Sequence, residues 1–452
     1  MVGVLLIGYG ARECSIADAF SRSPQKPDLY IADRQKNPFN VAIAKEHAVI
    51  PNLDVGGIVE FAKKHKDQID FGIVGPENPI INGVRDEVEK LGVPMICPTR
   101  EFALEGSKAR QRLLLEECCP EANPRFKIFD SKDYASTEEA KKELVLWLEE
   151  LDNKVAVKPD KPALGKGVGV WGDHFNTREQ IIEHFFSIYP SPVIVEEKID
   201  GEEFSLQFFT DGFNLVPAPA VRDYKRAFDN DAGPNTGGMG SYKDAGNILP
   251  FMTNKDLDDA TATGKRIFKK LGPSDGLRGI MYLAFTCAED GLKVFEINSR
   301  LGMPEAQCIM PVLKDDFVEV CFDMINGNVK NMHFDKKATV ATYKVPPTYG
   351  GKERVFENRA VDLTKALELK SKYGDDIRIY PCSMEVTNGK TRAMNSRTVC
   401  AVGIADSIQA AREISLDGIN AVKGDLWNRT DIASAGHIKK SIENMKRLRR
   451  MC

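Results

Sequence analysis

Short apolar runs alternate with amphipathic stretches over the first 105 residues. The apolar runs are VGVLLIG, PDLYIAD, DFGIVGP and VPMICP, and helical patterns such as GGIVEFAKKHK and NGVRDEVEKLG lie between them. Strands that alternate with helices are typical of a parallel sheet covered by helices on both faces. We therefore predict a parallel α/β, Rossmann-like domain over residues 1–105.

The pattern changes twice in the rest of the chain. Residues 106–195 begin with the amphipathic stretch SKARQRLLLEECC and continue as helix, strand, helix and strand. Residues 196–330 contain two apolar segments, EEFSLQFFTDGFNLVPAPAV and IMYLAFTCAEDGLKVFEIN, which predict antiparallel hairpins turned at Asp-Gly pairs. Residues 331–452 combine strand-like ATVATYKVP and RTVCAVGIA with helical DSIQAAREIS. The fold class expected is a multidomain chain of α/β and α+β parts.

Composition narrows the class of protein. Of 452 residues, 42% are hydrophobic and 28% are charged, as in ordinary globular proteins. No apolar stretch reaches the ~18 residues of a membrane span, and the N-terminus resembles a strand and turn more than a signal peptide. A net charge of −4 gives no reason to expect a nucleic-acid partner. Ten cysteines without a C-x-x-C pair favour reduced thiols in a cytoplasmic protein.

The first candidate site is the glycine turn GYGARE. Gly8 and Gly10 follow the first strand and precede a helix, and a helix N-terminus after a tight turn attracts phosphate. A dinucleotide fingerprint would have a third glycine where Glu13 stands, which counts against NAD. A merely tight turn is the alternative, and Arg12 inside the turn favours an anion site.

Glu77 ends another strand of the same sheet, in IVGPEN. Ligands of open α/β sheets bind beyond the carboxyl ends of the strands, so Glu77 is placed where it could meet one. A solvated glutamate in a turn is the alternative.

A second glycine-rich loop lies in VAVKPDKPALGKGVGVW, residues 155–171. A strand delivers Lys158, and Lys166 follows between Gly165 and Gly167. Glycine allows backbone N–H groups to approach an anion closely. The P-loop pattern requires Ser or Thr directly after the lysine, so this loop is not a P-loop.

The stretch VFEINSRLGMPEAQ, residues 294–307, predicts a metal site. Side chains alternate along a strand, so Glu296 and Asn298 share one face. A carboxylate and an amide oxygen are ligands suited to Mg²⁺ that already holds nucleotide phosphates. Arg300 continues the same face and could bridge phosphate oxygens bidentately. Polar residues on an exposed strand are the alternative.

A third glycine-rich loop, DNDAGPNTGGMGSY, follows DYKRAF. A polar loop of this length inside a compact domain is usually functional or disordered. Its candidate ligand-binding residues, with those just upstream, are Asp223, Lys225, Asn235, Thr236 and Gly237.

The motifs together resemble one family. EGSKAR, VAVKPDKPALGKGVGV, VIVEEKIDGEEFS, DYKRAFDNDAGPNTGGMGSY and FEINSRLGMPEAQ occur in the order found in the phosphoribosylamine–glycine ligase family of ATP-grasp enzymes. GYGARE and IVGPEN resemble the N-terminal motifs of that family, so the resemblance covers essentially the whole chain. GPNTGGMG is specific to the family, whereas the lysines and Glu-x-Asn are shared by ATP-grasp enzymes in general.

The resemblance implies four structural units. These are a pre-ATP-grasp domain (1–105), a first ATP-grasp subdomain with a glycine-rich lid (106–195), a second subdomain with the metal site (196–330) and a C-terminal α+β domain (331–452). It also implies a cytoplasmic ligase of purine biosynthesis that binds small molecules, with no membrane partner, as a monomer or weak homodimer.

The resemblance also assigns roles to residues. Lys108 and Lys158 would contact the ATP phosphates, and loop 160–169, with Gly165 and Gly167, would close over them and bring Lys166 near. Glu196, Glu197 and Ile199 would lie in the segment that binds adenine, and Glu203 would reach the ribose. Glu296 and Asn298 would hold Mg²⁺, with Mn²⁺ as an alternative ion. Arg300 and Lys166 would neutralise charge during catalysis. Glycine and phosphoribosylamine would meet the residues Gly8, Gly10, Arg12, Glu77, Asp223, Lys225, Asn235, Thr236 and Gly237.

The chain departs from the family pattern at five positions. Tyr9, Ala11 and Cys14 replace Asn, Gly and His, and Leu301 and Met303 replace Phe and Asp. Another carboxylate, such as Asp223 or Glu305, could take the place of the missing Asp. Three hypotheses stay open: the glycine ligase, an ATP-grasp ligase with another carboxylate or amine, and a nucleotide-binding regulator without activity.

Overall fold

The N-terminal sheet is parallel, as the alternating pattern predicts. The structure is a computed structural model that describes residues 1–162, 167–351 and 355–450. Five strands lie in the order β3-β2-β1-β4-β5. The strands are β1 (Gly3–Ile7), β2 (Asp28–Asp33), β3 (Glu46–Val49), β4 (Phe71–Val74) and β5 (Met95–Ile96). The helices are α1 (Ala11–Arg22), α2 (Pro38–Ile43), α3 (Val55–His65), α4 (Glu77–Ile81) and α5 (Val84–Val88). Successive strands are added on one side of β1 as far as β3 and on its other side from β4 onward. Open α/β sheets bind ligands at such a switch point, here between β1 and β4.

Three of these elements were not predicted: β3, α2, and α4, which begins at Glu77, where the sequence favoured a turn. Strand β3 is a half-exposed edge strand and α2 has only six residues, so neither carries a long apolar pattern. Such short elements depend on neighbours more than on local periodicity.

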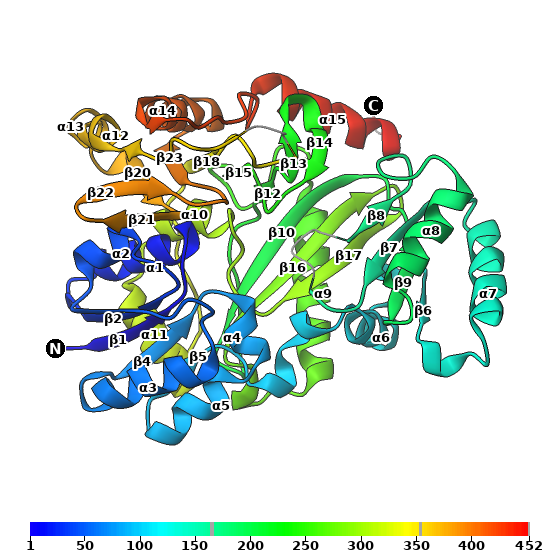
Figure 1. The fold of residues 1–452 in the computed structure, drawn as a ribbon, viewed down its shortest axis with the longest axis horizontal. Helices are drawn as coiled ribbons and strands as arrows, with labels where there is room; N and C mark the ends of the chain where they lie inside the picture. Colours follow the sequence, from blue (N-terminus) through cyan, green and yellow to red (C-terminus); the bar gives the residue numbers. More distant parts are fainter. Residues whose placement is uncertain (163–166, 352–354, 451–452) are drawn as a thin grey trace.

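A smaller antiparallel sheet follows, in the order β6-β9-β7-β8. Its elements are α6 (Lys108–Cys118), β6 (Phe126–Phe129), α7 (Thr137–Glu150), β7 (Val155–Pro159), β8 (Gly169–Val170), α8 (Arg178–Ile188) and β9 (Val193–Glu197). This sheet and helices α7 and α8 form a lobe at one side of the molecule (Figure 1). Phe129, Leu144, Val155 and Phe185 belong to a hydrophobic cluster of its own.

Both predicted hairpins are confirmed in the next sheet, ordered β11-β10-β16-β17. Strand β10 (Glu202–Thr210) pairs with β11 (Leu215–Pro217), and β16 (Gly279–Ala288) pairs with β17 (Gly291–Asn298), each antiparallel. The associated helices are α9 (Asn254–Leu271), α10 (Ala306–Ile309) and α11 (Phe317–Asn326).

A third large sheet, ordered β12-β15-β18-β23-β20, crosses the predicted boundary at residue 330. Strands β12 (Arg222–Asp223) and β15 (Gly240–Lys243) come from the middle of the chain. Strands β18 (Ala338–Lys344), β20 (Ile377–Pro381) and β23 (Val399–Ala405) come from the C-terminal part. The small hairpins are β13 (Arg226–Phe228) with β14 (Ala232–Asn235), β21 (Met384–Thr387) with β22 (Lys390–Ala393), and β19 (Val361–Asp362) with β24 (Lys423–Gly424). The remaining helices are α12 (Thr364–Glu368), α13 (Lys370–Tyr373), α14 (Ile408–Ala421) and α15 (Ala435–Leu448). The division into four units stays a prediction.

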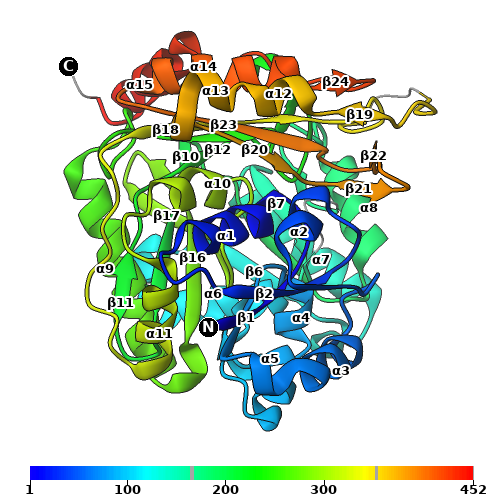
Figure 2. The same ribbon diagram turned by 90° about the vertical axis from the view of Figure 1, so that its left-hand side faces the viewer.

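The N-terminal part is packed against the rest of the molecule. Helix α1 lies between the parallel sheet and the sheet of β18, β20 and β23, whose other side is covered by α12–α14 (Figure 2). The ring of Phe20 lies 6.1 Å from Phe71 and 4.9 Å from Phe317 of α11, centroid to centroid. One hydrophobic cluster therefore runs through all three large sheets. In the described part of the chain, no helix has the length and apolar character needed to cross a bilayer.

Candidate active site

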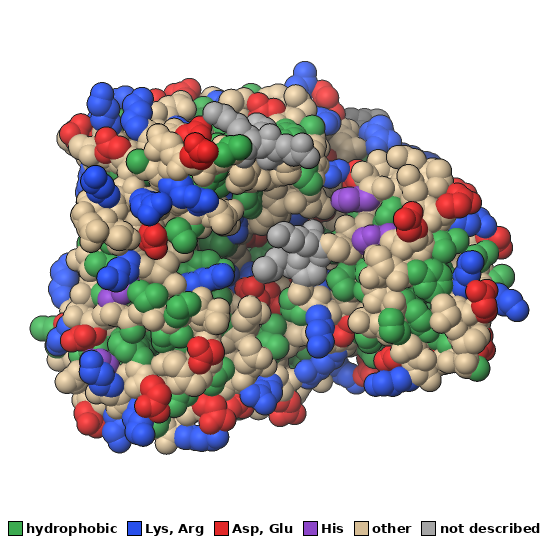
Figure 3. All heavy atoms as spheres, viewed as in Figure 1, with side chains coloured by type: hydrophobic (Ala, Val, Ile, Leu, Met, Phe, Trp, Pro, Cys, Tyr) green, Lys and Arg blue, Asp and Glu red, His purple; other side chains and the backbone are tan. Residues whose placement is uncertain are grey.

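The face seen in Figure 1 is hollowed at its middle, between the N-terminal part and the smaller lobe (Figure 3). The turns that follow β1 and β4 contact the end of β17. Arg300 Nε lies 3.6 Å from Glu77 Oε2, and Arg12 Nη1 donates to the carbonyl of Leu301 over 3.1 Å. The fold thus brings two N-terminal motifs together with a third that lies more than 200 residues further along the sequence.

The glycine turn after β1 encloses a buried carboxylate. Gly8 and Gly10 have φ of +145° and +100°, which favour glycine. A Cβ at Gly8 would lie 2.5 Å from Glu13 Cγ, and one at Gly75 only 1.9 Å from Glu13 Oε1. Burial raises the pKa of Glu13, although Arg12 Nε lies 2.8 Å from its Oε1. These glycines therefore make room for Glu13, which the sequence suggested only as the position of a missing glycine. The Arg12 guanidinium, predicted to bind an anion, is already paired with Glu13.

The predicted metal ligands lie side by side on β17. Glu296 and Asn298 pair with Ala284 and Tyr282 of β16, after an irregularity in the register. Asn298 is 4% exposed, and its Oδ1 is buried with no hydrogen-bond partner among the described residues. An unpartnered buried acceptor next to a carboxylate is costly unless something occupies it. This donor set fits a hard divalent cation such as Mg²⁺.

Arg300 is held by two carboxylates. Its Nη2 lies 2.8 Å from Glu105 Oε1, in addition to the contact with Glu77. Burial, with the nearby charges of Glu77 and Glu296, raises the pKa of Glu105 to about 7 despite the opposing charge of Arg300. For Glu77, burial is outweighed by Arg300 and Arg12, so its pKa is lowered. Glu105 was not among the predicted site residues, although it precedes Gly106 in the EGSKAR motif.

Lys158, on β7, faces a buried ion-pair network. Glu196 accepts from Lys158 Nζ through one oxygen and lies 2.7 Å from Arg112 Nε through the other. Arg112 also donates to the carbonyls of Val294 and Phe295, each over 2.7 Å. Burial is outweighed by Arg112 and Lys158, so the pKa of Glu196 is lowered. The side chain of Glu196 therefore holds Lys158 between β7, β9 and β17.

Lys108 begins α6 beside the start of the predicted lid. Its N–H donates to the carbonyl of Asp160 over 3.0 Å and its Nζ to that of Lys161 over 3.1 Å. Asp160 Oδ1 accepts from Ser107 Oγ at 2.7 Å and from the N–H of Ala109 at 2.9 Å. Burial and the charge of Lys158 lower the pKa of Lys108, against the pull of nearby carboxylates.

The centre of the predicted lid, with Gly165 and Lys166, lies outside the described residues. Gly167 is described, with φ of +82°, and its carbonyl lies 3.0 Å from His184 Nε2.

The predicted adenine segment ends β9. Backbone N–H groups of Glu197 and Lys198 already donate to the carbonyls of Arg125 and Lys154, at 2.9 and 2.8 Å. Within the described residues, the N–H of Ile199 has no such partner. Glu203 is exposed on β10, and one of its oxygens lies 3.4 Å from Lys225 Nζ. The structure therefore leaves one N–H of this segment for a base.

The third glycine-rich loop is fixed by its own neighbours. Thr236 donates twice to the carbonyl of Lys225, from N–H at 2.7 Å and from its hydroxyl at 2.8 Å. The N–H of Gly237 donates to Tyr349 Oη over 3.2 Å, and its carbonyl accepts from Arg397. Asn235 ends β14 and pairs with Arg226. The hydroxyl of Thr236 is thus used within the loop.

Asp223 has a buried oxygen, Oδ1, with no partner among the described residues. Burial and the charge of Glu305 raise its pKa, although Lys225 and Arg397 lie close enough to oppose the shift. Glu305 accepts from Tyr282 Oη at 2.7 Å. Asp223, whose Oδ1 is buried, and the buried Glu305 therefore influence one another electrostatically, beside the cations of Lys225 and Arg397.

Met303 borders the glycine turn. Its Sδ lies 3.5 Å from the position of a Cβ on Gly10, and its carbonyl accepts from Arg397 Nη1 at 3.0 Å. Arg397, which contacts both this segment and Gly237, was not among the predicted site residues. No local pattern marks an arginine in the C-terminal part as a neighbour of these loops.

Comparisons with known protein families match two regions of the chain. Residues 2–105 match the N domain of phosphoribosylglycinamide synthetase, and residues 124–306 match the ATP-grasp (A) domain of the same family. A phosphoribosylamine–glycine ligase of Methanosarcina barkeri is 37% identical over 452 residues, covering 99% of each chain.

Two solved structures share the fold. The crystal structure of a phosphoribosylamine–glycine ligase from Thermotoga maritima has a TM-score of 0.74 and 22% identity, and the match covers 95% of this chain and 100% of that one. The biotin carboxylase domain of a 2-oxoglutarate carboxylase from Hydrogenobacter thermophilus, solved with MgADP, ADP and bicarbonate, has a TM-score of 0.69 and 15% identity, and the match covers 98% of this chain and 93% of that one.

Proposed function

The chain belongs to the phosphoribosylamine–glycine ligase family, and we propose that it uses ATP to join glycine to 5-phosphoribosylamine in de novo purine synthesis. The observation that carries this function is the end of β17. There the unpartnered Asn298 Oδ1 and Glu296 lie next to Arg300, which the N-terminal turn residue Glu77 contacts. We place the enzyme in the cytoplasm, as a monomer or weak homodimer.

ATP lies between the smaller lobe and β17 in this proposal. Adenine accepts a hydrogen bond from the N–H of Ile199 near Glu197, and Glu203 binds the ribose. Lys108 and Lys158 contact the phosphates, with Lys166 and the glycines 165 and 167 closing over them. The buried Glu196 supports this role because it orients Lys158, and the lowered pKa of Lys108 reflects a desolvated ammonium that gains from an anion.

Glu296 and Asn298 hold Mg²⁺, with Mn²⁺ as an alternative ion. When bound, the ion neutralises phosphate charge and polarises the γ-phosphate. Arg300 adds positive charge beside it, since burial and two carboxylates keep its guanidinium fixed in place.

The reaction has two balanced steps. A carboxylate oxygen of glycine attacks the γ-phosphorus, the bond to the β-phosphate oxygen breaks, and ADP leaves as glycyl phosphate forms. The amine of 5-phosphoribosylamine then attacks the acyl carbon, loses one proton, and displaces phosphate to form the amide. The residues named here bind and orient the reactants, exclude water and balance charge, and no protein nucleophile takes part.

Asp223 binds the ammonium of glycine in place of the family aspartate that Met303 replaces. A thioether carries no charge and is a weak acceptor, so Met303 cannot hold an ammonium. Asp223 Oδ1 is buried without a partner, and Glu305 lies near enough to raise its pKa, so an added cation would be strongly favoured. Gly8, Gly10, Arg12, Lys225, Asn235, Thr236 and Gly237 complete the substrate site with Glu77.

A substrate-omission assay tests the function. We expect ADP release only when ATP, Mg²⁺, glycine and 5-phosphoribosylamine are all present. ADP release that is unchanged without glycine would overturn the proposal. A competition assay with alanine, β-alanine and small acids without an amine tests Asp223, since a better substrate than glycine would favour the alternative, a ligase for another carboxylate or amine.

A further inference from the structure

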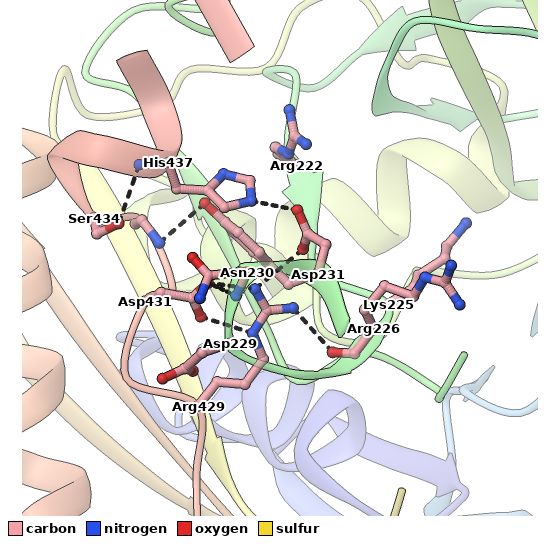
Figure 4. A network of polar contacts seen from close by, with 12 residues as sticks. Arg222, Lys225, Arg226, Asp229, Asn230, Asp231, Arg429, Asp431, Ser434 and His437 are labelled. Carbon is pink, nitrogen blue, oxygen red and sulfur yellow. Dashed lines mark hydrogen bonds and ion pairs between the residues drawn. The ribbon is translucent and has the colours of Figure 1, made fainter. Parts of the chain in front are cut away.

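A network of polar contacts joins the C-terminal segment 429–437 to the hairpin β13–β14 (Figure 4). The side chain of Arg429 is fully buried at the centre of this network. Its Nη1 donates to the carbonyl of Arg226 over 2.9 Å, and its Nη2 lies 3.1 Å from Asp231 Oδ1. Asp431 accepts from Arg429 Nε at 2.8 Å and from the N–H of Asn230 at 2.8 Å. One arginine thus connects the start of β13 and Asp231, just before β14, to the C-terminal segment.

Three further contacts reach the same hairpin. His437 Nε2 lies 2.6 Å from Asp231 Oδ2, and this contact and Arg429 outweigh burial and lower the pKa of Asp231. Thr430 donates to Asp229 from its N–H at 2.8 Å and its hydroxyl at 2.5 Å. The network therefore contacts each residue of the turn 229–231 separately.

The turn 229–231 has a backbone conformation that the intrinsic preferences of its residues do not favour. Asn230 and Asp231 have φ of +61° and +56°, two successive left-handed residues that are not glycine. Such conformations are uncommon and persist when surrounding contacts determine them. The contacts from Asp431, Arg429 and His437 supply that determination.

The hairpin ends in the proposed substrate site. Strand β14 leads directly to Thr236 and Gly237, and Thr236 is bound to the carbonyl of Lys225, just before β13. Arg222, beside Asp223, is also held by the C-terminal helix, because its Nη1 donates to Ser441 Oγ over 3.0 Å and pairs with Glu202. Movement of the hairpin would therefore move the residues that bind substrate.

We infer that Arg429 and His437 are positioning residues, which fix hairpin β13–β14 and thereby hold residues 223–225 and 235–237 in the geometry that binds glycine. The inference rests on the proposed function for the role of those residues. The contacts between the C-terminal segment and the hairpin do not depend on it.

The test combines hydrogen exchange with kinetics in Arg429→Met and His437→Phe. In the substrate-free full-length protein, we expect exchange of residues 226–238 to accelerate at least about tenfold. The KM for glycine should rise about tenfold, while the KM for ATP stays within about twofold. His437→Gln retains an N–H donor for Asp231 and should restore most of the loss.

Arg449→Met is the matched control. Arg449, just beyond α15, also makes a bidentate ion pair, with Asp256 at 2.9 and 2.8 Å, but it has no contact with the hairpin among the described residues. It should leave the exchange of 226–238 and the KM for glycine unchanged. If Arg429→Met is unstable, His437→Phe and Thr430→Val, which loses one hydroxyl contact, carry the same test.

Unchanged exchange at 226–238 in Arg429→Met, His437→Phe and Thr430→Val would overturn the inference, as would equal rises in KM for glycine and ATP. Faster exchange with a selective rise in the glycine KM supports it. The wild type could also show no glycine-dependent ADP release while the variants exchange faster. That result would support the hairpin contacts and overturn the proposed function.

Discussion

Single buried carboxylates determine much of the chemistry of this site. Glu105 and Glu196 each lie beside an arginine or lysine contributed by another motif, and Glu13 lies beside Arg12 of its own turn. A buried charge is tolerated only when it is paired, so these residues fix the positions of Arg300, Lys158 and Arg12. The positions of the catalytic cations are therefore set by acidic residues that contact no substrate in the proposed mechanism.

Glu105 should make stability depend on pH. Its pKa in the folded protein is about 7, above the 4.5 of an unperturbed glutamate. Between these values the unfolded chain ionises while the folded protein keeps its proton, so the contribution is present below pH 4.5 and lost as pH rises through 7. Relative to Glu105→Gln, the free energy of unfolding of the wild type should fall by up to about 3 kcal/mol over this window. Urea titrations at several pH values measure it, with Glu101→Gln, an exposed neighbour, as the control. Parallel curves for the wild type and Glu105→Gln would contradict the prediction.

Glu296→Ala should abolish most turnover and leave the fold intact. Removing one metal ligand costs on the order of several kcal/mol of transition-state stabilisation, so kcat should fall at least about a hundredfold. The partly exposed side chain belongs to no hydrophobic cluster, and cooperative unfolding should persist. Steady-state kinetics at saturating Mg²⁺ measure it, with Glu289→Ala in the turn of the same β16–β17 hairpin as the control. A kcat near that of the wild type would remove Glu296 from the metal site.

At the scale of elements, the N-terminus of α6 connects the proposed ATP site to the start of the predicted lid. Asp160 accepts from the Ser107 hydroxyl and from the backbone N–H groups of Ala109 and Lys108, and so binds the helix start that Ser107 caps. An acceptor at a helix N-terminus satisfies N–H groups that lack partners within the helix, and a negative charge there interacts favourably with the helix dipole.

Asp160→Ala should weaken ATP binding selectively. Loss of hydrogen bonds to a charged group costs about 1.5 kcal/mol or more, which corresponds to about a tenfold rise in the KM for ATP. The KM for glycine should change little, because the contacts of Asp160 are with the α6 terminus. Asp130→Ala removes a similar side-chain contact, to the N–H of Lys132, in the same lobe and serves as the control. Equal effects of both variants on the KM for ATP would show a general loss of stability.

At the scale of the whole molecule, the N-terminal part and the smaller lobe differ in how much of their hydrophobic core they share with the rest of the chain. The lobe with β6–β9 packs around a hydrophobic cluster of its own. The N-terminal part also has one, around Leu5, Ile7 and Tyr30, but Phe20 and Phe71 belong to a second, shared cluster and pack on Phe317 and Phe322 of α11. A part whose core is shared exposes apolar surface when it is excised.

Fragments test this difference. Residues 124–198 should unfold cooperatively in urea as an isolated fragment, because their core is their own. Residues 1–105 should not, and should bind a hydrophobic dye, because the α11 surface is missing. Circular dichroism and dye fluorescence measure both. A cooperative transition in the fragment 1–105 would contradict the shared core.

The sequence by itself determined the local features of this protein. Period-two and helical patterns predict the parallel sheet, the two hairpins and the shared face of Glu296 and Asn298, because a side chain's direction depends only on its place along a strand. Motif order also determined the family. Only the tertiary structure decided which charges meet: Glu105 pairs with Arg300 across 195 residues, and Arg112 pairs with Glu196 across 84. It also decided that β12 and β15 join the C-terminal sheet and that Arg429 contacts the turn of hairpin β13–β14. The physical reason is that periodicity reports which face is buried, whereas partners in a buried ion pair are chosen by packing between elements distant in sequence.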